Sequence, residues 1–238
     1  MQAKQPEAAP DTALSFPNQE SFAAQVLTPG RFHADEVWPE AGKASWVGLF
    51  KGKTGFYLAQ SSVSTRRVYD PVLDDSLTSR TGWQVSVQHP DSCLLLVAGP
   101  GYLRNRPVRP VALSPKSVLP GRELTFSYGN GRYRLFATGQ QRALHGTPAD
   151  VEIRHYRLYL QAMRGNHTAT ALLVAHPSFN AQSTYVLFAG DLDGDAFPDF
   201  ILDTSCQNNS FIPTLYLSKP AGKGQLLKAV GQHASAGC

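Results

Sequence analysis

The sequence predicts an all-β protein, an antiparallel sandwich or squat barrel of about a dozen strands with one short N-terminal helix. Three observations lead to this prediction. Most apolar segments are short, and they either alternate with polar residues or run without interruption over the length of a strand. Residues that favour turns are abundant, with 20 Gly and 17 Pro among 238 residues. Only one segment spaces its apolar residues as a helix does. Two packed antiparallel sheets would bury both kinds of strand.

The segment 17–30, PNQESFAAQVLTPG, is the one with helical spacing. Phe22 and Val26 lie one turn apart, Ala23 and Leu27 fall beside them, and TPG ends the pattern. We therefore expect a short helix here, preceded by a flexible lead-in over residues 1–15.

The other apolar segments are predicted to be strands of a single β-rich domain over residues 16–238. The clearest is the hairpin 123–139, in which Asn130-Gly131 is expected to supply the turn with positive φ. The stretch 139–150 is expected to be a loop or a subdomain boundary. The remaining predicted strands lie in 45–60 (two strands around a Lys/Gly turn), 82–89, 93–99, 151–163 paired with 167–176, 184–190, 199–205, 213–218 and 224–233.

Charge and hydropathy argue against a nucleic-acid partner and against a membrane-spanning segment. The formal net charge is only +4, and the one local concentration of basic residues is Arg104, Arg106 and Arg109. Prolines interrupt this run and no stacking aromatics are interleaved, so a nucleic-acid partner is not predicted. No apolar run has the length needed to span a bilayer, so no membrane span is predicted.

The start of the chain predicts export. QAKQPEAAPDTA after Met1 is polar and rich in small residues, like the first residues that remain after a signal peptide is cleaved. We therefore expect a periplasmic or secreted protein whose leader has been removed.

The three cysteines fit an oxidising compartment. Cys93 lies in an apolar run, Cys206 in the polar stretch TSCQNNS, and Cys238 is the last residue. A terminal cysteine does not serve a core, so we predict a Cys206–Cys238 disulfide, with Cys93 reduced and buried. The odd number of cysteines leaves other pairings open.

The strongest chemical signal is an acidic loop between two predicted strands. Numbered from Asp191, carboxylates fall at positions 1, 3, 5 and 9, and Gly194 permits a sharp turn. Calcium takes six to eight oxygen ligands in a flexible shell, whereas magnesium demands a small octahedral one, so the loop predicts calcium. An EF-hand is excluded, because its position 12 requires Glu and here it is Leu202. The predicted ligands are the side chains of Asp191, Asp193, Asp195 and Asp199 and the carbonyl of Phe197.

The run GDLDGDAFPDFIL resembles the calcium loop of FG-GAP/VCBS-type repeats, which occur in the β-propellers of integrin α chains and in many bacterial surface proteins. This resemblance implies the same five ligands. Ala196 stands where the family usually has Gly, so a positive φ there would cost about 1 kcal/mol. The motif occurs once in this chain, whereas propellers repeat it blade by blade. The wider C-terminal run is also similar to exported proteins of Bacteroidetes-type bacteria, which implies no activity.

Signals for catalysis are weak. The seven histidines are isolated, without HxH or HExxH spacing, and no G-x-S-x-G elbow marks a nucleophile. The group His89, Asp91, Ser92 and Cys93 is interpreted as a turn. Asp74 and Asp75 could serve glycoside hydrolysis with another carboxylate, but a solvated turn explains them better. Two tyrosines, Tyr156 and Tyr159, are expected on opposite faces of one strand, so that one packs in the core and the other faces outward.

The leading hypothesis is an exported, calcium-stabilised β protein that binds a protein or glycan partner without catalysing a reaction. The alternative is a secreted hydrolase that acts on glycan or peptidoglycan, with calcium supporting the fold.

Overall fold

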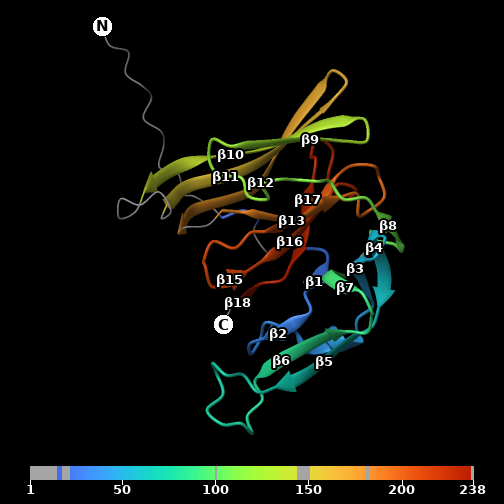
Figure 1. Cartoon of the computed structure of the whole chain (residues 1–238), viewed down its shortest axis with the longest axis vertical. Helices are drawn as coiled ribbons and strands as arrows, with labels where there is room; N and C mark the ends of the chain where they lie inside the picture. The colour runs from blue at the N-terminus through green and yellow to red at the C-terminus, as the bar shows by residue number, and fades with distance from the viewer. Residues whose placement is uncertain (1–14, 18–21, 100, 144–150, 181–182, 237–238) are drawn as a thin grey trace.

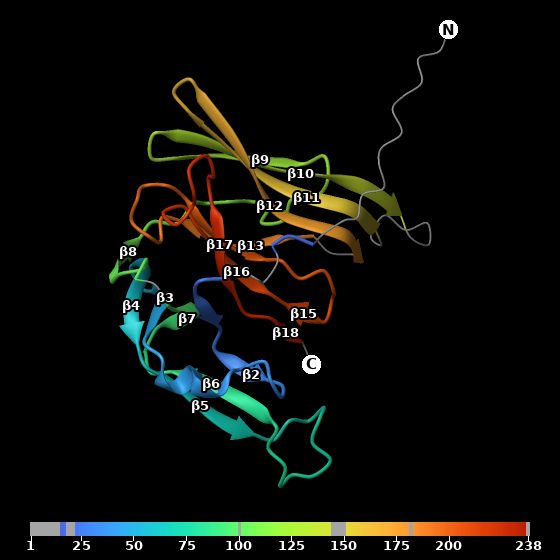
Figure 2. The same cartoon turned by 180° about the vertical axis from the view of Figure 1, so that it is seen from behind.

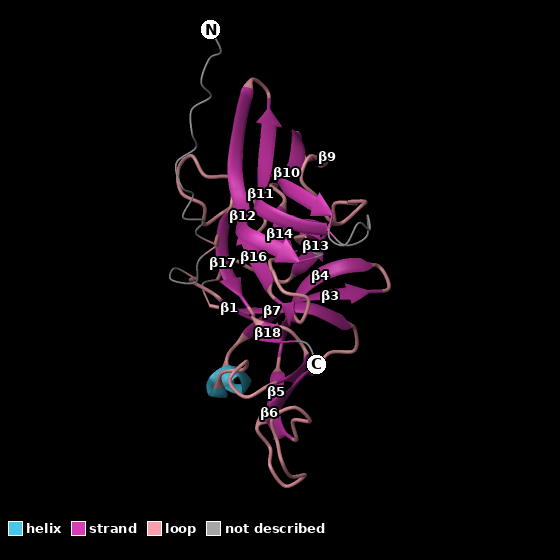
Figure 3. Ribbon diagram, turned by 90° about the vertical axis from the view of Figure 1, so that its left-hand side faces the viewer, coloured by secondary structure: helices cyan, strands magenta, loops and turns pink. Residues whose placement is uncertain are grey.

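The computed structural model describes residues 15–17, 22–99, 101–143, 151–180 and 183–236. Within these residues, eighteen strands form five sheets whose paired strands are all antiparallel, so the predicted all-β class is confirmed. A short 3₁₀ helix, Pro39–Lys43, is the one helix in the described part of the chain (Figure 3). No helix among the described residues is long and apolar enough to cross a bilayer.

Four of the sheets stack along the long axis of the molecule (Figure 1). The upper sheet, ordered β12-β11-β10-β9, contains β9 (Glu123–Tyr128), β10 (Gly131–Ala143), β11 (Val151–Arg164) and β12 (His167–Asn180). The central sheet contains, in order, β13 (Tyr185–Gly190), β14 (Asp199–Asp203), β16 (Pro213–Leu217) and β17 (Lys228–Gln232).

Two further sheets complete the stack. The five-stranded sheet, ordered β1-β7-β3-β4-β8, contains β1 (Gln25–Leu27), β3 (Trp46–Gly52), β4 (Gly55–Ser61), β7 (Ser92–Ala98) and β8 (Arg106–Val108). The lowest sheet, ordered β2-β6-β5, contains β2 (Gly30–Phe32), β5 (Val63–Val68) and β6 (Gly82–Val87). A small pair outside the stack joins β15 (Ser210–Phe211) to β18 (Ser235–Ala236).

The central sheet is buried on both faces. In β14, Phe200 and Leu202 pack into the core below the upper sheet, whereas Ile201 packs into the core above the five-stranded sheet. In β16, Tyr216 packs into the core below the upper sheet and Leu215 into the core above the five-stranded sheet. Successive strand residues point to opposite faces, so a strand with two apolar surroundings must be apolar throughout. This explains the uninterrupted apolar runs of the sequence.

The five-stranded sheet is also covered on both faces. Leu95 of β7 enters the core shared with the central sheet, and the next residue, Leu96, enters a third core. Phe32 and Trp83 of the lowest sheet close that third core. The two-sheet sandwich expected from the sequence is therefore extended into a stack of four sheets with three cores between them.

The predicted helix over residues 17–30 is wrong. Gln25–Leu27 is β1, with Val26 opposite Val97 of β7, and Gly30–Phe32 is β2. Val26 and Leu27 enter different cores on opposite faces of the sheet, which is strand geometry. Pairing with β7 and this double burial outweigh the local helical spacing. Residues 18–21 of the predicted helix lie outside the described residues.

The β9–β10 hairpin is confirmed, but its turn lies one residue earlier than expected. Gly131 pairs with Tyr128, so Gly129 and Asn130 form the two-residue turn. The positive φ belongs to Gly129, at 52°. Glycine adopts this conformation without strain, so the turn takes it in preference to Asn130.

The strand β10 is longer than expected. Residues 139–143, expected to begin a loop, continue β10: the register is irregular at Gly139, and residues 140–143 pair with residues 151–154 of β11. The rest of the expected loop, 144–150, lies outside the described residues. The other predicted strands are confirmed, within a few residues at their ends.

Two of the three cysteines, Cys93 and Cys206, lie among the described residues. Neither Cys93 nor Cys206 forms a disulfide with another described residue. Cys93 is half-buried, its Sγ donates to the carbonyl of Leu95 at 3.5 Å, and burial raises the pKa of its thiol to about 12. Cys238 and the lead-in 1–14 lie outside the described residues, so the Cys206–Cys238 disulfide stays a prediction.

Candidate metal centre

The acidic loop connects β13 to β14, the first two strands of the central sheet. Asp199 is the first residue of β14, as expected, and it pairs with Gly190, the last residue of β13. Both strands are held by cores on their two faces, so the loop starts and ends on rigid elements. Such anchoring fixes where the loop's side chains can point.

Three of the predicted ligands converge. Asp191, Asp193 and Asp195 each offer a carboxylate oxygen, and these oxygens lie within 4.8 Å of one another. Calcium binds oxygen at about 2.3–2.6 Å, so two ligands of one ion are at most about 5 Å apart. The three carboxylates therefore lie close enough together to hold one metal ion. No other group of three or more His, Cys, Asp or Glu residues in the described ranges has this spacing.

Asp191 organises the backbone of the loop. Its Oδ1 accepts hydrogen bonds from the N–H groups of Gly194 (2.6 Å) and Asp195 (3.2 Å), and its Oδ2 accepts from the N–H of Ala196 (3.1 Å). Hydrogen bonds from one side chain to successive N–H groups curl the chain around that carboxylate. This curl keeps Asp193 and Asp195 close to Asp191.

Asp193 carries the most informative atom of the site. Its side chain is buried, with 6% of the residue exposed, and its Oδ2 accepts the N–H of Lys219 at 2.8 Å. Its Oδ1 is also buried but has no hydrogen-bond partner in the described structure. Burial, assisted by the charges of Asp195 and Asp191, raises the pKa of Asp193 to about 6. A buried acceptor without a donor is costly, and a cation would satisfy it.

Asp199 lies outside the three-carboxylate cluster and holds the loop to neighbouring backbone. Its Oδ2 accepts the N–H groups of Leu192 (2.6 Å) and Asp193 (3.0 Å), and its Oδ1 accepts the N–H of Ser218 (2.8 Å). Burial and the charge of Asp193 raise its pKa well above the ordinary value, although these N–H donors oppose the shift. A ligand role for Asp199 stays a prediction, since an ion would have to share oxygens that already accept hydrogen bonds.

The segment after β16 contributes contacts that the motif does not reveal. The Ser218 hydroxyl lies 2.9 Å from Asp195 Oδ2 and 3.1 Å from Asp199 Oδ1, and can donate to either. The backbone of Lys219 reaches Asp193. These residues are distant in sequence and have no local signature, so only the sheet pairing of β14 with β16 brings them to the loop.

Two arginines flank the loop, and neither was predicted to do so. Arg106 of β8 donates from Nη2 to Asp191 Oδ2 at 3.2 Å. Arg164 of β11 donates to the carbonyl of Ala196 at 3.1 Å, and its guanidinium lies 3.4 Å from the centre of the Phe197 ring. Both hold the loop, and Arg106 also offsets part of its negative charge.

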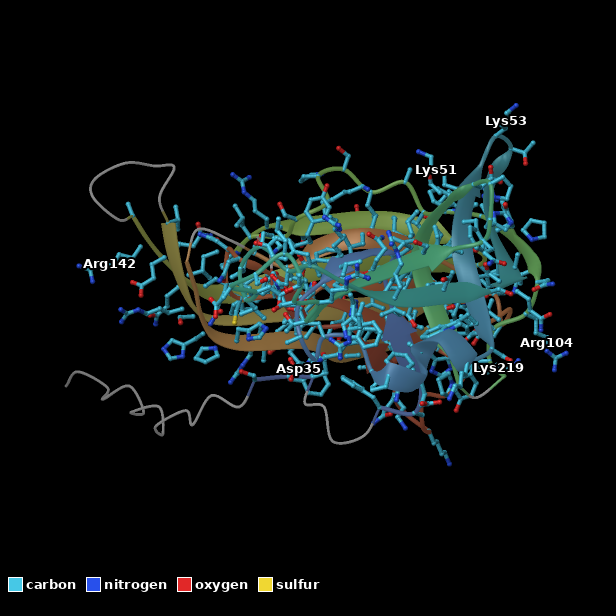
Figure 4. The ribbon with its side chains drawn as sticks, turned by 90° about the horizontal axis from the view of Figure 1, so that it is seen from below. Asp35, Lys51, Lys53, Arg104, Arg142 and Lys219 are labelled. Atoms are coloured by element: carbon cyan, nitrogen blue, oxygen red, sulfur yellow. The ribbon has the colours of Figure 1, made fainter. Side chains whose placement is uncertain are left out.

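The basic run of the sequence therefore does not act as one patch. Arg106 turns inward to the acidic loop, whereas Arg104 is exposed and projects from one end of the molecule (Figure 4).

The other candidate residues have structural partners. Asp74 is buried and accepts the N–H groups of Asp70 and Thr81, whereas its neighbour Asp75 is exposed. The interpretation as a solvated turn therefore fits Asp75 and is wrong for Asp74, whose buried carboxylate is an acceptor for backbone N–H groups. As expected, His89 and Asp91 lie in the connection between β6 and β7.

Partners also account for the second group of candidates. Asp91 accepts the hydroxyl of Tyr57 at 2.5 Å, and its N–H donates to His89. Ser92 is exposed and begins β7 together with Cys93, so the expected turn ends at Asp91, and no hydrogen bond joins the Ser92 side chain to His89 or Asp91 in the described structure. Tyr156 is fully buried and Tyr159 lies on the opposite face of β11, as predicted.

The strain expected at position 196 is present. Ala196 has a φ of 67°, in the left-handed region that costs a residue with a Cβ about 1–2 kcal/mol. We expect Ala196→Gly to stabilise the protein by about 0.5–1 kcal/mol in urea unfolding, because relief of strain exceeds the added entropy of the unfolded chain. Ala44→Gly is the matched control. Ala44 has a φ of −75°, so this change should destabilise. Equal losses for both variants would contradict the assignment of strain.

Comparison with known proteins adds no relative. No family model, no curated protein and no solved structure matches this chain.

Proposed function

We propose that this protein binds one calcium ion in the loop 191–199, that the ion is structural, and that the protein is an exported binding module. The observation that carries the metal proposal is Asp193 Oδ1, a buried carboxylate oxygen without a hydrogen-bond partner in the described structure, beside two further carboxylates. Three negative charges at this spacing repel one another, and a divalent cation would turn that repulsion into attraction.

The donor set favours calcium over softer metals. Asp191, Asp193 and Asp195 offer only oxygen, which suits hard cations, and no His or Cys belongs to the cluster of described residues. The motif adds the Phe197 carbonyl and Asp199 as expected ligands. Arg106 competes for Asp191, so we expect a modest affinity, with a dissociation constant of about 10⁻⁴–10⁻³ M, as in extracellular calcium modules. An affinity in this range fits an exported protein.

The outer face of the upper sheet supports a role in binding. Phe136 and Tyr159 lie opposite each other on β10 and β11, and their rings stack with centroids 5.2 Å apart. Both are half-buried and lie on the side of the sheet away from its core. The guanidinium of Arg134 lies over the Phe136 ring. Flat aromatic groups beside polar side chains suit a glycan or protein surface, so we assign the binding face here.

A calcium titration tests the metal proposal and predicts a pH dependence. Calcium needs the ionised carboxylate, and the pKa of Asp193 is raised to about 6. In the metal-free protein a raised carboxyl pKa favours the folded state at low pH, and this contribution is lost as pH rises through about 6. Calcium binding follows the opposite course, because the ion must displace the proton. We expect calorimetry on chelator-treated protein to give an affinity roughly tenfold weaker at about pH 5 than at about pH 7.5.

Two variants make the titration specific. Asp193→Asn keeps the size of the side chain and an acceptor for Lys219, but it removes the charge, so calcium binding should be lost. Asp35→Asn, an exposed acid outside the loop (Figure 4), should bind calcium as the unmodified protein does. Calcium binding as tight in Asp193→Asn as in the unmodified protein would rule out this loop as the site.

A further inference from the structure

A second surface stands apart from the acidic loop. Residues 69–81, here called the tip loop, connect β5 to β6 and project from one end of the long axis of the molecule (Figures 1 and 2). Three aliphatic side chains of this loop are exposed: Val72 (64%), Leu73 (50%) and Leu77 (80%). They are the three most exposed large hydrophobic residues in the described structure, where the next, Tyr185, reaches 43%. Clustered exposure of this kind marks a site of interaction.

The tip loop is held in shape by two buried carboxylates. Asp70 accepts the N–H groups of Val72 (2.9 Å) and Leu73 (3.3 Å), and its other oxygen lies 2.6 Å from His33 Nδ1. Asp74 accepts the N–H groups of Asp70 (2.7 Å) and Thr81 (3.1 Å). These hydrogen bonds fix the backbone, so the exposure of the aliphatic groups is built into the fold. A surface fixed in advance loses little conformational entropy when it binds.

Basic side chains lie behind the apolar tip. Arg31 of β2 and Arg66 of β5 are both paired with Gln84 of β6, so all three share one face of the lowest sheet. The opposite face of this sheet, with Phe32 and Trp83, packs into the third core.

These arginines are available to a partner. Arg31 and Arg66 are exposed, as is Arg80 of the tip loop, and no ion pair joins any of them to another described residue. The exposed acid of the loop is Asp75. Within the lowest sheet and the tip loop, the exposed charged residues are therefore four arginines, Arg31, Arg66, Arg67 and Arg80, against Asp75; Asp35, which follows β2, is also exposed.

We propose that the tip loop docks onto an anionic lipid surface, with Val72, Leu73 and Leu77 entering the boundary of the acyl chains and the arginines facing lipid phosphates. Aliphatic insertion combined with basic residues is the pattern of interfacial membrane binding. The shape also favours lipid over a protein partner. A projecting aliphatic tip needs no complementary pocket in a bilayer, whereas the energetic centres of protein interfaces are enriched in Trp, Tyr and Arg and poor in Leu and Val.

This docking is independent of calcium. The tip loop shares no residue or hydrogen bond with the acidic loop among the described residues, and it needs no bridging ion. Failure of the calcium proposal would therefore leave the lipid proposal standing, and the reverse also holds. Three aliphatic side chains give weak, reversible attachment.

Sedimentation with lipid vesicles tests the proposal. We expect the protein to partition onto vesicles that contain phosphatidylglycerol, more weakly onto pure phosphatidylcholine, and less at high salt. The double variant Leu73→Ser/Leu77→Ser should lower partitioning by about tenfold or more. Arg31→Gln, Arg66→Gln and Arg80→Gln should each lower it by about fivefold on anionic vesicles.

Matched controls distinguish vesicle binding through the tip loop from nonspecific vesicle binding by other exposed residues. Leu119→Ser removes an exposed leucine elsewhere, and Lys53→Gln removes a charge from the β3–β4 turn (Figure 4); neither should change partitioning. The substituted leucines are half or more exposed, so the double variant should keep the unfolding midpoint of the unmodified protein. Absence of vesicle binding, or binding unaffected by the double variant, would overturn the proposal. A tip loop that instead captures a protein partner would give the first of these results.

Discussion

Calcium is expected to raise the midpoint of thermal unfolding by about 5–10 °C when the free ion exceeds its dissociation constant a hundredfold. The metal-free loop holds three carboxylates with oxygens within 4.8 Å, and Asp193 Oδ1 is buried without a described donor. An ion that binds only the folded state adds about 2.7 kcal/mol at this excess. For a chain of this size, each kcal/mol moves the midpoint by about 2–4 °C. Calorimetric scans of chelator-treated protein with and without calcium measure the shift.

The effect should depend on one side chain and on the choice of cation. Asp193→Asn removes a ligand charge while preserving the acceptor for Lys219, so its midpoint should be the same with and without calcium. Magnesium should produce a smaller shift, because a flexible all-oxygen loop does not impose its octahedral shell. If the unmodified protein melts at one temperature in chelator and in excess calcium, the ion has no structural role here.

The strands of the core were predictable from sequence because their burial leaves a local pattern. Residues 200–202 (FIL) and 215–217 (LYL) in the central sheet are apolar throughout, since each residue meets one of two cores. The β9–β10 hairpin alternates, because one face of the upper sheet is outside the core. A strand buried on both faces therefore shows a continuous apolar run, and a strand buried on one face shows alternation of apolar and polar residues.

Short strands defined by distant partners were not predictable. Gln25–Leu27 is a strand because β7 pairs with it and because two cores take its alternate side chains. Within the segment itself, Phe22, Val26 and Leu27 have the spacing of a helix. A three-residue strand has too few residues to show a period, so tertiary pairing decides its conformation. The stack of four sheets was not predictable for the same reason, since no local sequence pattern indicates which sheet packs on which.

In the candidate site too, residues close in sequence were predictable, whereas residues contributed by distant strands were not. Asp191, Asp193 and Asp195 lie within one loop, so their spacing predicted their convergence, and the resemblance to a loop with Gly at position 196 predicted the strain at Ala196. Arg106 reaches this loop from β8, in another sheet. The sequence separation of such contacts hides them from motif analysis.

Asp199 has a different role from its neighbours, and replacing it should have the largest effect of any single change in the loop. Its carboxylate accepts three backbone N–H groups, from Leu192, Asp193 and Ser218, and it is fully buried. Asp199→Ala leaves these donors without their acceptor, and each unpaired buried group costs about 1–3 kcal/mol. Loss of a buried charge beside Asp193 relieves some repulsion. We therefore expect a net loss of about 2–4 kcal/mol in the free energy of unfolding.

This loss should appear in chelator as well as in calcium, because the N–H groups need their acceptor whether or not an ion is present. Asp193→Asn is the matched comparison. It keeps its acceptor for Lys219 and lowers the repulsion between carboxylates, so in chelator it should be as stable as the unmodified protein or slightly more stable. Urea unfolding of both variants, each with and without calcium, separates the two roles. Asp199→Ala could instead be as stable as the unmodified protein in chelator and less stable than it only in calcium. That result would show that Asp199 acts as a ligand and not as the acceptor that holds the loop to β14 and β16.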